Sequence, residues 1–198
     1  MRQYVILLLI PAVFIITPVS AAQRSSLMLH FGAGLADAAR PSYIDRFWRD
    51  GVVFHFAFGV EPTPPWAFSF SLTHYTFDYA AGVEPQGDKA GVNVFTACGQ
   101  YRRPFGDYRL FYTAGFGFGA ASAPPVFEKQ EKEASPSPGR LLEPPHQNGG
   151  PAAHLAIGIE RLLNDGAALA VETFAEGIFM ERQPFIGFGL RAKIKFTL

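Results

Sequence analysis

Two residues near the middle of the sequence carry side chains that could do chemistry together. His74 and Thr76 stand two positions apart, and in a β-strand this spacing puts both side chains on one face. A histidine beside a hydroxyl pairs a general base with a nucleophile. Ordinary strand packing is the simpler interpretation, because such two-residue coincidences are common in strands.

No other catalytic or metal-binding motif is evident in the sequence. The chain has five histidines, namely His30, His55, His74, His146 and His154. They form no HExxH motif and no paired Cys/His spacing, so we predict no metal site. There is no G-x-S-x-G motif and no phosphate-binding loop, and 17 basic residues balance 17 acidic ones. We therefore predict no catalytic residues, no cofactor and no nucleic-acid partner.

Charged residues in the later part of the chain fall on alternate positions, as in Arg191, Lys193 and Lys195. Residues with this spacing share one face of a strand, and charges buried inside a barrel must pair and hydrogen-bond. We predict an interior ion-pair network that fixes strand register. Its members are Glu160, Glu172, Glu176, Arg191, Lys193, Lys195 and Arg109. A gated proton or ion path, or a catalytic carboxylate, is the alternative interpretation.

The first 22 residues have the features of a secretory signal peptide. Arg2 gives a positive start, Tyr4–Ile16 is an apolar run, and Val19–Ala22 is a small-residue cleavage site. The run is shorter than the ~20 residues that a spanning helix needs. We predict that residues 1–22 are removed and that residues 23–198 form one domain.

The rest of the chain divides into eight segments of strand character, most of them near the ~9–11 residues that a tilted strand needs to cross a bilayer. They are Ser26–Ala36, Gly51–Glu61, Trp66–Tyr79, Gly91–Arg102, Tyr108–Ala120, Ala152–Leu163, Ala167–Phe179 and Phe185–Leu198. Three joins are short turns with Pro, Gly or Asp, and most of the others are long. This alternation is typical of outer-membrane barrels. Residues 121–150, rich in Pro, Glu, Lys and Ser, are predicted to be a long mobile external loop.

Aromatic and aliphatic side chains alternate with small or polar ones along most segments. The chain has 20 Phe and 20 Gly but only 17% charged residues. Rings from eight strands would overfill a small barrel, whereas on the outside they form the apolar band that lipid requires. The rings predicted to face lipid are Phe54, Phe56, Phe58, Phe68, Phe70, Phe116, Phe118 and Phe188. The predicted fold class is therefore all-β, an eight-stranded antiparallel up-and-down transmembrane β-barrel.

Two segments depart from this alternation. Tyr75, Phe77 and Tyr79 are out of phase with the apolar residues that precede them, and Val92 and Val94 are out of phase with the apolar residues that follow them. We expect bulges near the rim at both places. Trp66 at one end of its segment, with Tyr75 and Tyr79 at the other, fits the aromatic belts of the two membrane interfaces.

The mature chain resembles the eight-stranded outer-membrane barrel superfamily that includes the OmpA transmembrane domain and the opacity-like proteins. The resemblance rests on the strand pattern and on a last strand that carries Phe196 near its end. It implies a bacterial outer-membrane location, contact with outer-membrane lipid, and recognition of the C-terminal strand by the outer-membrane assembly machinery. That machinery favours an aromatic end, and here Thr197 and Leu198 follow Phe196.

A narrower resemblance is to the lipid A deacylase barrels of the acyloxyacyl hydrolase type, carried by Phe111–Gly117 and Ala167–Ile178. It implies a His and a Ser two residues apart on the penultimate strand and a Glu on the last. The corresponding positions here hold Glu172, Phe174 and Ile186, so none of the three matches. An ester hydrolase without a nucleophile and a base should not work.

Three functions remain open from the sequence. The first is an outer-membrane barrel with a structural or surface-interaction role, no catalysis and an unidentified external partner. The second is a membrane-embedded acyl hydrolase, and the third is a soluble periplasmic barrel that binds lipid. The direction in which Phe54, Phe56 and Phe58 point distinguishes the third from the other two.

Overall fold

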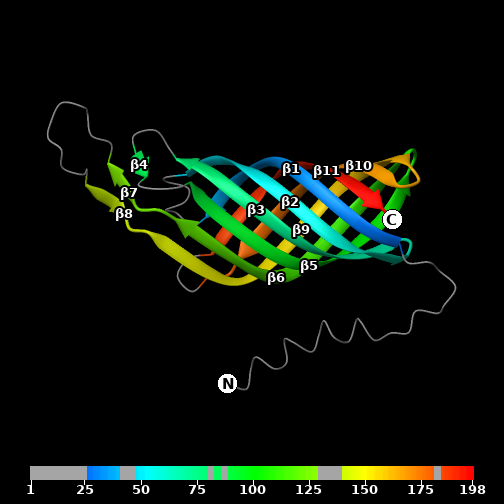
Figure 1. The fold of residues 1–198 in the computed structure, drawn as a ribbon, viewed down its shortest axis with the longest axis horizontal. Coiled ribbons are helices and arrows are strands. Elements are labelled where there is room, and N and C mark those ends of the chain that lie inside the picture. The colour runs from blue at the N-terminus through cyan, green and yellow to red at the C-terminus, as the bar shows by residue number, and fades with distance from the viewer. Residues whose placement is uncertain (1–25, 41–47, 80–82, 86–88, 129–139, 181–183) are drawn as a thin grey trace, which may run out of the picture.

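A computed structural model describes residues 26–40, 48–79, 83–85, 89–128, 140–180 and 184–198. The predicted signal peptide at residues 1–22 lies outside the described residues. Every described element is a β-strand (Figure 1). Eight long strands form a closed antiparallel barrel, and three short strands form a separate sheet.

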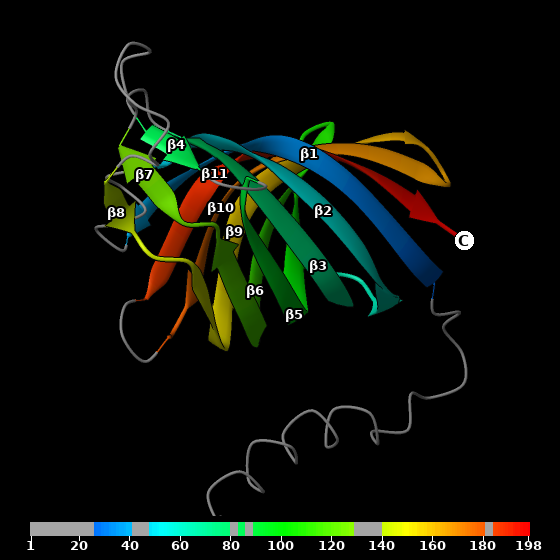
Figure 2. The same ribbon diagram turned by 60° about the vertical axis from the view of Figure 1, so that its left-hand side comes forward.

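Each long strand pairs with the neighbouring long strand in sequence, and the pairing of β1 with β11 closes the barrel (Figure 2). This closure gives the first and last strands a partner on both sides, so the barrel has no free edge. The barrel strands are β1 (Ser26–Arg40), β2 (Trp48–Thr63), β3 (Trp66–Tyr79), β5 (Ala90–Phe105), β6 (Tyr108–Ala123), β9 (His146–Asn164), β10 (Ala167–Ile178) and β11 (Phe185–Thr197). The predicted fold class is confirmed.

The two ends of the barrel differ. Short turns join β2 to β3, β5 to β6 and β9 to β10 at one end, and Gly106 takes the positive φ of 59° that one of these turns requires. At the opposite end lies the small sheet formed by β4 (Val83–Pro85), β7 (Val126–Glu128) and β8 (Leu141–Glu143) (Figure 1). We call these the short-turn end and the long-loop end.

The strands extend further into residues 121–150 than the sequence predicted. β6 continues to Ala123 and β9 begins at His146, and the two strands pair up to that point. β7 and β8 also lie within this segment. Part of the segment predicted as a mobile loop is therefore strand, and residues 129–139 lie outside the described residues.

The predicted bulges do not account for the changed alternation in β3 and β5. Near the long-loop end, the register shift between β2 and β3 lies beyond Phe77, and its extra residue is on β2. β3 and β5 pair without a register shift from Trp66–Tyr101 to Phe77–Ala90. Odd-numbered residues of β3 face the interior throughout, so Tyr75 and Phe77 are fully buried inside the barrel. The apolar side chains change sides here because the interior itself becomes apolar towards the long-loop end. Tyr75 therefore does not belong to an aromatic belt.

The strands are staggered around the barrel. Ala168 on β10 can be followed through its paired residues on the seven other barrel strands. This path returns to β10 at Ile178, ten positions further along the chain. A stagger of this kind tilts the strands relative to the barrel axis. As a result, side chains of residues that are not paired in the sheet meet in the interior, and β3 can contact β10 across it.

The closure between β1 and β11 depends on a glycine. A Cβ at Gly34 would stand 2.0 Å from the carbonyl oxygen of Leu190 and 2.7 Å from Cβ of Arg191. We predict that Gly34→Ala lowers the free energy of unfolding by about 1–3 kcal/mol, the usual cost of overpacking. Urea unfolding in detergent micelles measures this. Gly99→Ala is the matched control, because a Cβ there would stand 3.9 Å from its nearest neighbour. Equal stability of the two variants would contradict the prediction.

Candidate functional site

Three charged side chains meet in the middle of the barrel interior. Glu172 on β10 accepts hydrogen bonds from Arg191 Nε and, at 2.5 Å, from Lys193 Nζ, both on β11. Arg191 and Glu172 are 1% exposed and Lys193 is 6% exposed. The pairing of β10 with β11 places Glu172 directly opposite Arg191. The carboxylate thus has two cationic partners in a site shielded from solvent.

A second group of charges lies nearer the short-turn end. Lys195 Nζ is 3.3 Å from Glu160 Oε1 and 3.8 Å from Glu61 Oε2, while Arg109 reaches Glu160 at 3.7 Å. Arg102 Nη1 forms an ion pair with Glu61. The predicted network did not include Glu61, although this residue lies on the inward face that the alternation gives to β2.

Glu176, as deeply buried as Glu172, has no lysine or arginine within ion-pair distance among the residues that the structure describes. Its oxygens accept hydrogen bonds from Thr73 Oγ1 at 3.0 Å and from the Tyr75 hydroxyl at 2.6 Å. His154 Nδ1 lies 2.8 Å from Glu176 Oε1, although it is not aligned for a hydrogen bond. His154 was missed, although its alternation with Glu160 on β9 places it on the inward face.

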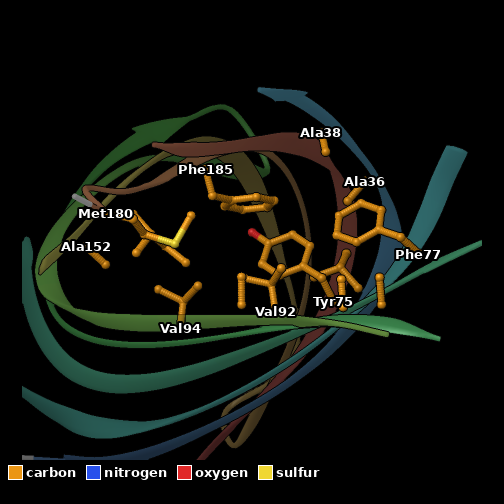
Figure 3. Packing of buried hydrophobic residues seen from close by; sticks show 14 of the residues in the cluster. Ala36, Ala38, Tyr75, Phe77, Val92, Val94, Ala152, Met180 and Phe185 are labelled. Carbon is orange, nitrogen blue, oxygen red and sulfur yellow. The ribbon is translucent and has the colours of Figure 1, made fainter. Parts of the chain in front are cut away.

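An apolar layer fills the interior beyond Glu176, towards the long-loop end. Tyr75 stacks on Phe77 with ring centroids 5.9 Å apart, and Phe185 meets Tyr75 edge-on at 5.7 Å. Figure 3 shows these rings facing one another inside the barrel, with Met180 and Val92 packed beside them. The interior therefore consists of a charged layer and an apolar layer, with Tyr75 contacting both.

The outer surface carries the aromatic side chains that were predicted to face lipid. All of them point away from the interior and are exposed, from 37% for Phe56 to 77% for Phe116. The full set is Phe54, Phe56, Phe58, Phe68, Phe70, Phe116, Phe118 and Phe188. The interpretation in which these rings line an enclosed pocket is therefore wrong. Instead, the interior holds the charged residues.

His74 and Thr76 are brought together on the outer surface by β3. Thr76 Oγ1 lies 3.1 Å from His74 Nε2, and His74 Nδ1 lies 2.8 Å from Asn93 Oδ1 on the neighbouring strand β5. Asn93 was not predicted as part of this group. The register of β3 against β5 sets His74 opposite Asn93. This register does not follow from the sequence as long as bulges are expected in these two strands.

The positions implied by the deacylase resemblance do not form a site. Glu172 and Phe174 are buried in the interior, whereas Ile186 on β11 is exposed on the outside. Among the described residues, no group of three or more His, Cys, Asp or Glu side chains is placed to hold a metal ion. The same residues contain no helix long and apolar enough to cross a membrane.

Comparison with known proteins shows the fold. No protein-family model matches the sequence, and no curated protein matches it significantly. Neisserial surface protein A is similar in structure, with a TM-score of 0.61 and 10% sequence identity over 88% of this chain and 99% of that chain. A major outer membrane protein of Thermus thermophilus has a TM-score of 0.52 at 11% identity, over 89% of this chain and 100% of its own.

Ail, the attachment invasion locus protein of Yersinia pestis, has a TM-score of 0.46 at 11% identity, over 87% of this chain and 97% of its own. Identities this low establish architecture only. The chain has the fold of the eight-stranded outer-membrane β-barrels, with its apolar side chains on the outside of the barrel.

The central ion pairs generate a stability prediction. Glu172→Gln leaves Arg191 and Lys193 buried without an anionic partner, which typically costs about 3–5 kcal/mol. We expect a correspondingly lower free energy of unfolding in urea. Asp78→Asn is the control, because the Asp78–Lys89 pair has side chains 64% and 60% exposed and should contribute less than about 1 kcal/mol. If both variants unfold at the wild-type midpoint, the interior ion pairs do not stabilise the fold.

Proposed function

We propose that this protein is a bacterial outer-membrane barrel that is closed to permeation and has a structural or surface-interaction role. The observation that carries the proposal is the chemical difference between the outer and inner faces of the strands. Large apolar side chains cover the outside, while buried charges pair inside. In water this arrangement would expose a large apolar surface, whereas in a bilayer it matches the apolar band of spanning barrels.

The filled interior supports the absence of transport. An eight-stranded barrel has an interior just wide enough for side chains to fill. Here the charged layer around Glu172 and the apolar layer around Phe77 and Phe185 follow one another along the axis. An ion crossing the barrel would have to separate buried ion pairs and then lose its hydration in the apolar layer, which costs several kcal/mol.

Two contacts with other molecules belong to this proposal. Phe196 and Ile194 are exposed on the outer face of β11, which supports recognition of this strand by the outer-membrane assembly machinery. At the long-loop end, β4, β7 and β8 extend the structure beyond the barrel wall, and Leu141 is 50% exposed there. This small sheet supports an external interaction surface, with the short turns on the periplasmic side.

Residence in a bilayer is tested by placing a charge on the outside. We expect Phe56→Arg to lower the free energy of unfolding in lipid vesicles by about 2–4 kcal/mol, the cost of an arginine near the middle of a bilayer. Phe105→Arg, at the end of β5 beside a short turn, is the control and should cost about 0–1 kcal/mol. Equal, small effects at both positions would argue for an aqueous surface.

Closure is tested by conductance. We expect the wild-type protein in a planar bilayer to show no steady ion current, because side chains occupy the interior. The Phe77→Ala, Phe185→Ala double variant removes two rings of the apolar layer and should show measurable openings. A steady current through the wild-type protein would contradict the proposal and favour the ion-path interpretation of the interior charges.

A further inference from the structure

We propose that His74, Thr76 and Asn93 form a hydrolytic site for carboxylic esters of amphiphiles held at the membrane surface. The site lies outside the barrel and is separate from the interior charges. It goes beyond the structural role proposed above. Its basis is a chain of two side-chain hydrogen bonds that links a nucleophile, a base and an orienting group.

The hydrogen bonds fix the roles of the three side chains. The amide oxygen of Asn93 can only accept, so Nδ1 of His74, at 2.8 Å, carries the hydrogen. In a neutral imidazole the other nitrogen, Nε2, is then a free acceptor. The Thr76 hydroxyl, 3.1 Å away, donates to it. This is the protonation pattern in which a histidine can take the proton of an attacking hydroxyl.

The position of the site matches that of lipid ester groups. Even-numbered residues of β3 point outward, and the apolar members Phe68, Phe70 and Leu72 come first along the strand from the short-turn end. His74 and Thr76 follow, and the exposed Asp78–Lys89 ion pair lies beyond them. The site therefore lies where an apolar band gives way to charge. In a bilayer this boundary separates acyl chains from headgroups.

On the β5 side, no side chain lies beside the Thr76 hydroxyl, whereas Val52 is the partner of Thr76 on β2. Gly91 is the partner of Thr76 on β5, and it has no side chain to cover the hydroxyl. Position 91 is also close to the base, because a Cβ at Gly91 would lie 3.8 Å from Cε1 of the His74 ring. Towards the apolar band, Phe54 and Phe95 are 53% and 58% exposed. These rings can contact an acyl chain whose ester carbonyl lies over Gly91.

The reaction is an ester hydrolysis in two steps. Thr76 Oγ1 attacks the carbonyl carbon while His74 Nε2 takes the hydroxyl proton, and the alkoxide leaving group departs with that proton as the alcohol. Water then attacks the acyl-threonine ester, again giving a proton to Nε2. The acid is released and the proton returns to Thr76. We expect slow turnover, because backbone N–H groups in a paired ladder cannot form the oxyanion hole that speeds such reactions.

The experiment measures acyl release and covalent capture with the full-length protein. The purified barrel is reconstituted in vesicles of dioleoyl phosphatidylethanolamine and phosphatidylglycerol, and released oleic acid is measured by mass spectrometry. A long-chain fluorophosphonate is added separately, and the labelled residue is identified by peptide mass spectrometry. Each variant is first shown to be folded by its heat-dependent gel mobility.

The variants separate chemistry from structure. Thr76→Ala and His74→Ala should each reduce release by about 100-fold or more, in line with the loss of a triad member. Thr76→Ser keeps the hydroxyl and should retain release and labelling. Gly91→Leu keeps all three polar groups but covers the substrate position, so it should reduce release. Thr173→Ala, at an exposed threonine on β10, is the matched control and should act as wild type.

Release by the wild type that is lost in Thr76→Ala, with the fluorophosphonate attached at Thr76, supports the proposal. The absence of both release and labelling in folded wild-type protein overturns it, as does wild-type release by Thr76→Ala. In either of those cases the three side chains only satisfy one another at the surface. Neither result affects the closed-barrel proposal, which conductance tests independently.

Discussion

The structure depends on a constraint that acts on every strand at once. A chain that crosses lipid must satisfy its backbone hydrogen bonds within itself, because hydrocarbon offers no partner. The pairing of β1 with β11 meets this requirement by removing the last free edges. Once the sheet is closed, each strand has an inside and an outside, and alternate residues are committed to opposite environments. The apolar surface and the buried charges are both consequences of closure.

The interior shows how buried charges can be accommodated in a narrow barrel. Glu172 lies between two cations, and Glu176 receives hydroxyl donors from Thr73 and Tyr75 on the opposite wall. These contacts join β3 to β10 and β10 to β11, so they connect strands that are not all neighbours in the sheet. Misplacing one strand by a single residue would turn its charges towards the outside. The network therefore favours one register over the others.

Strand number, most boundaries and the two faces follow from the sequence, because a period of two is a strong signal over ten or more residues. The outer end of β3 was misinterpreted for a physical reason. Apolar residues of a barrel strand need not face lipid, and here Tyr75 and Phe77 fill an apolar part of the interior. The partnership of His74 with Asn93 could not be predicted either, because it depends on the exact register between β3 and β5.

The central claim is that the two faces of each strand meet different media, with acyl chains outside and paired charges inside. Nuclear Overhauser effects between lipid methylene protons and phenylalanine ring protons, measured in lipid nanodiscs, test this directly. The account predicts cross-peaks for the exposed rings of Phe54, Phe58 and Phe116 and none for the buried rings of Phe111 and Phe174. Lipid contacts at the two buried rings, with none at the exposed ones, would contradict it.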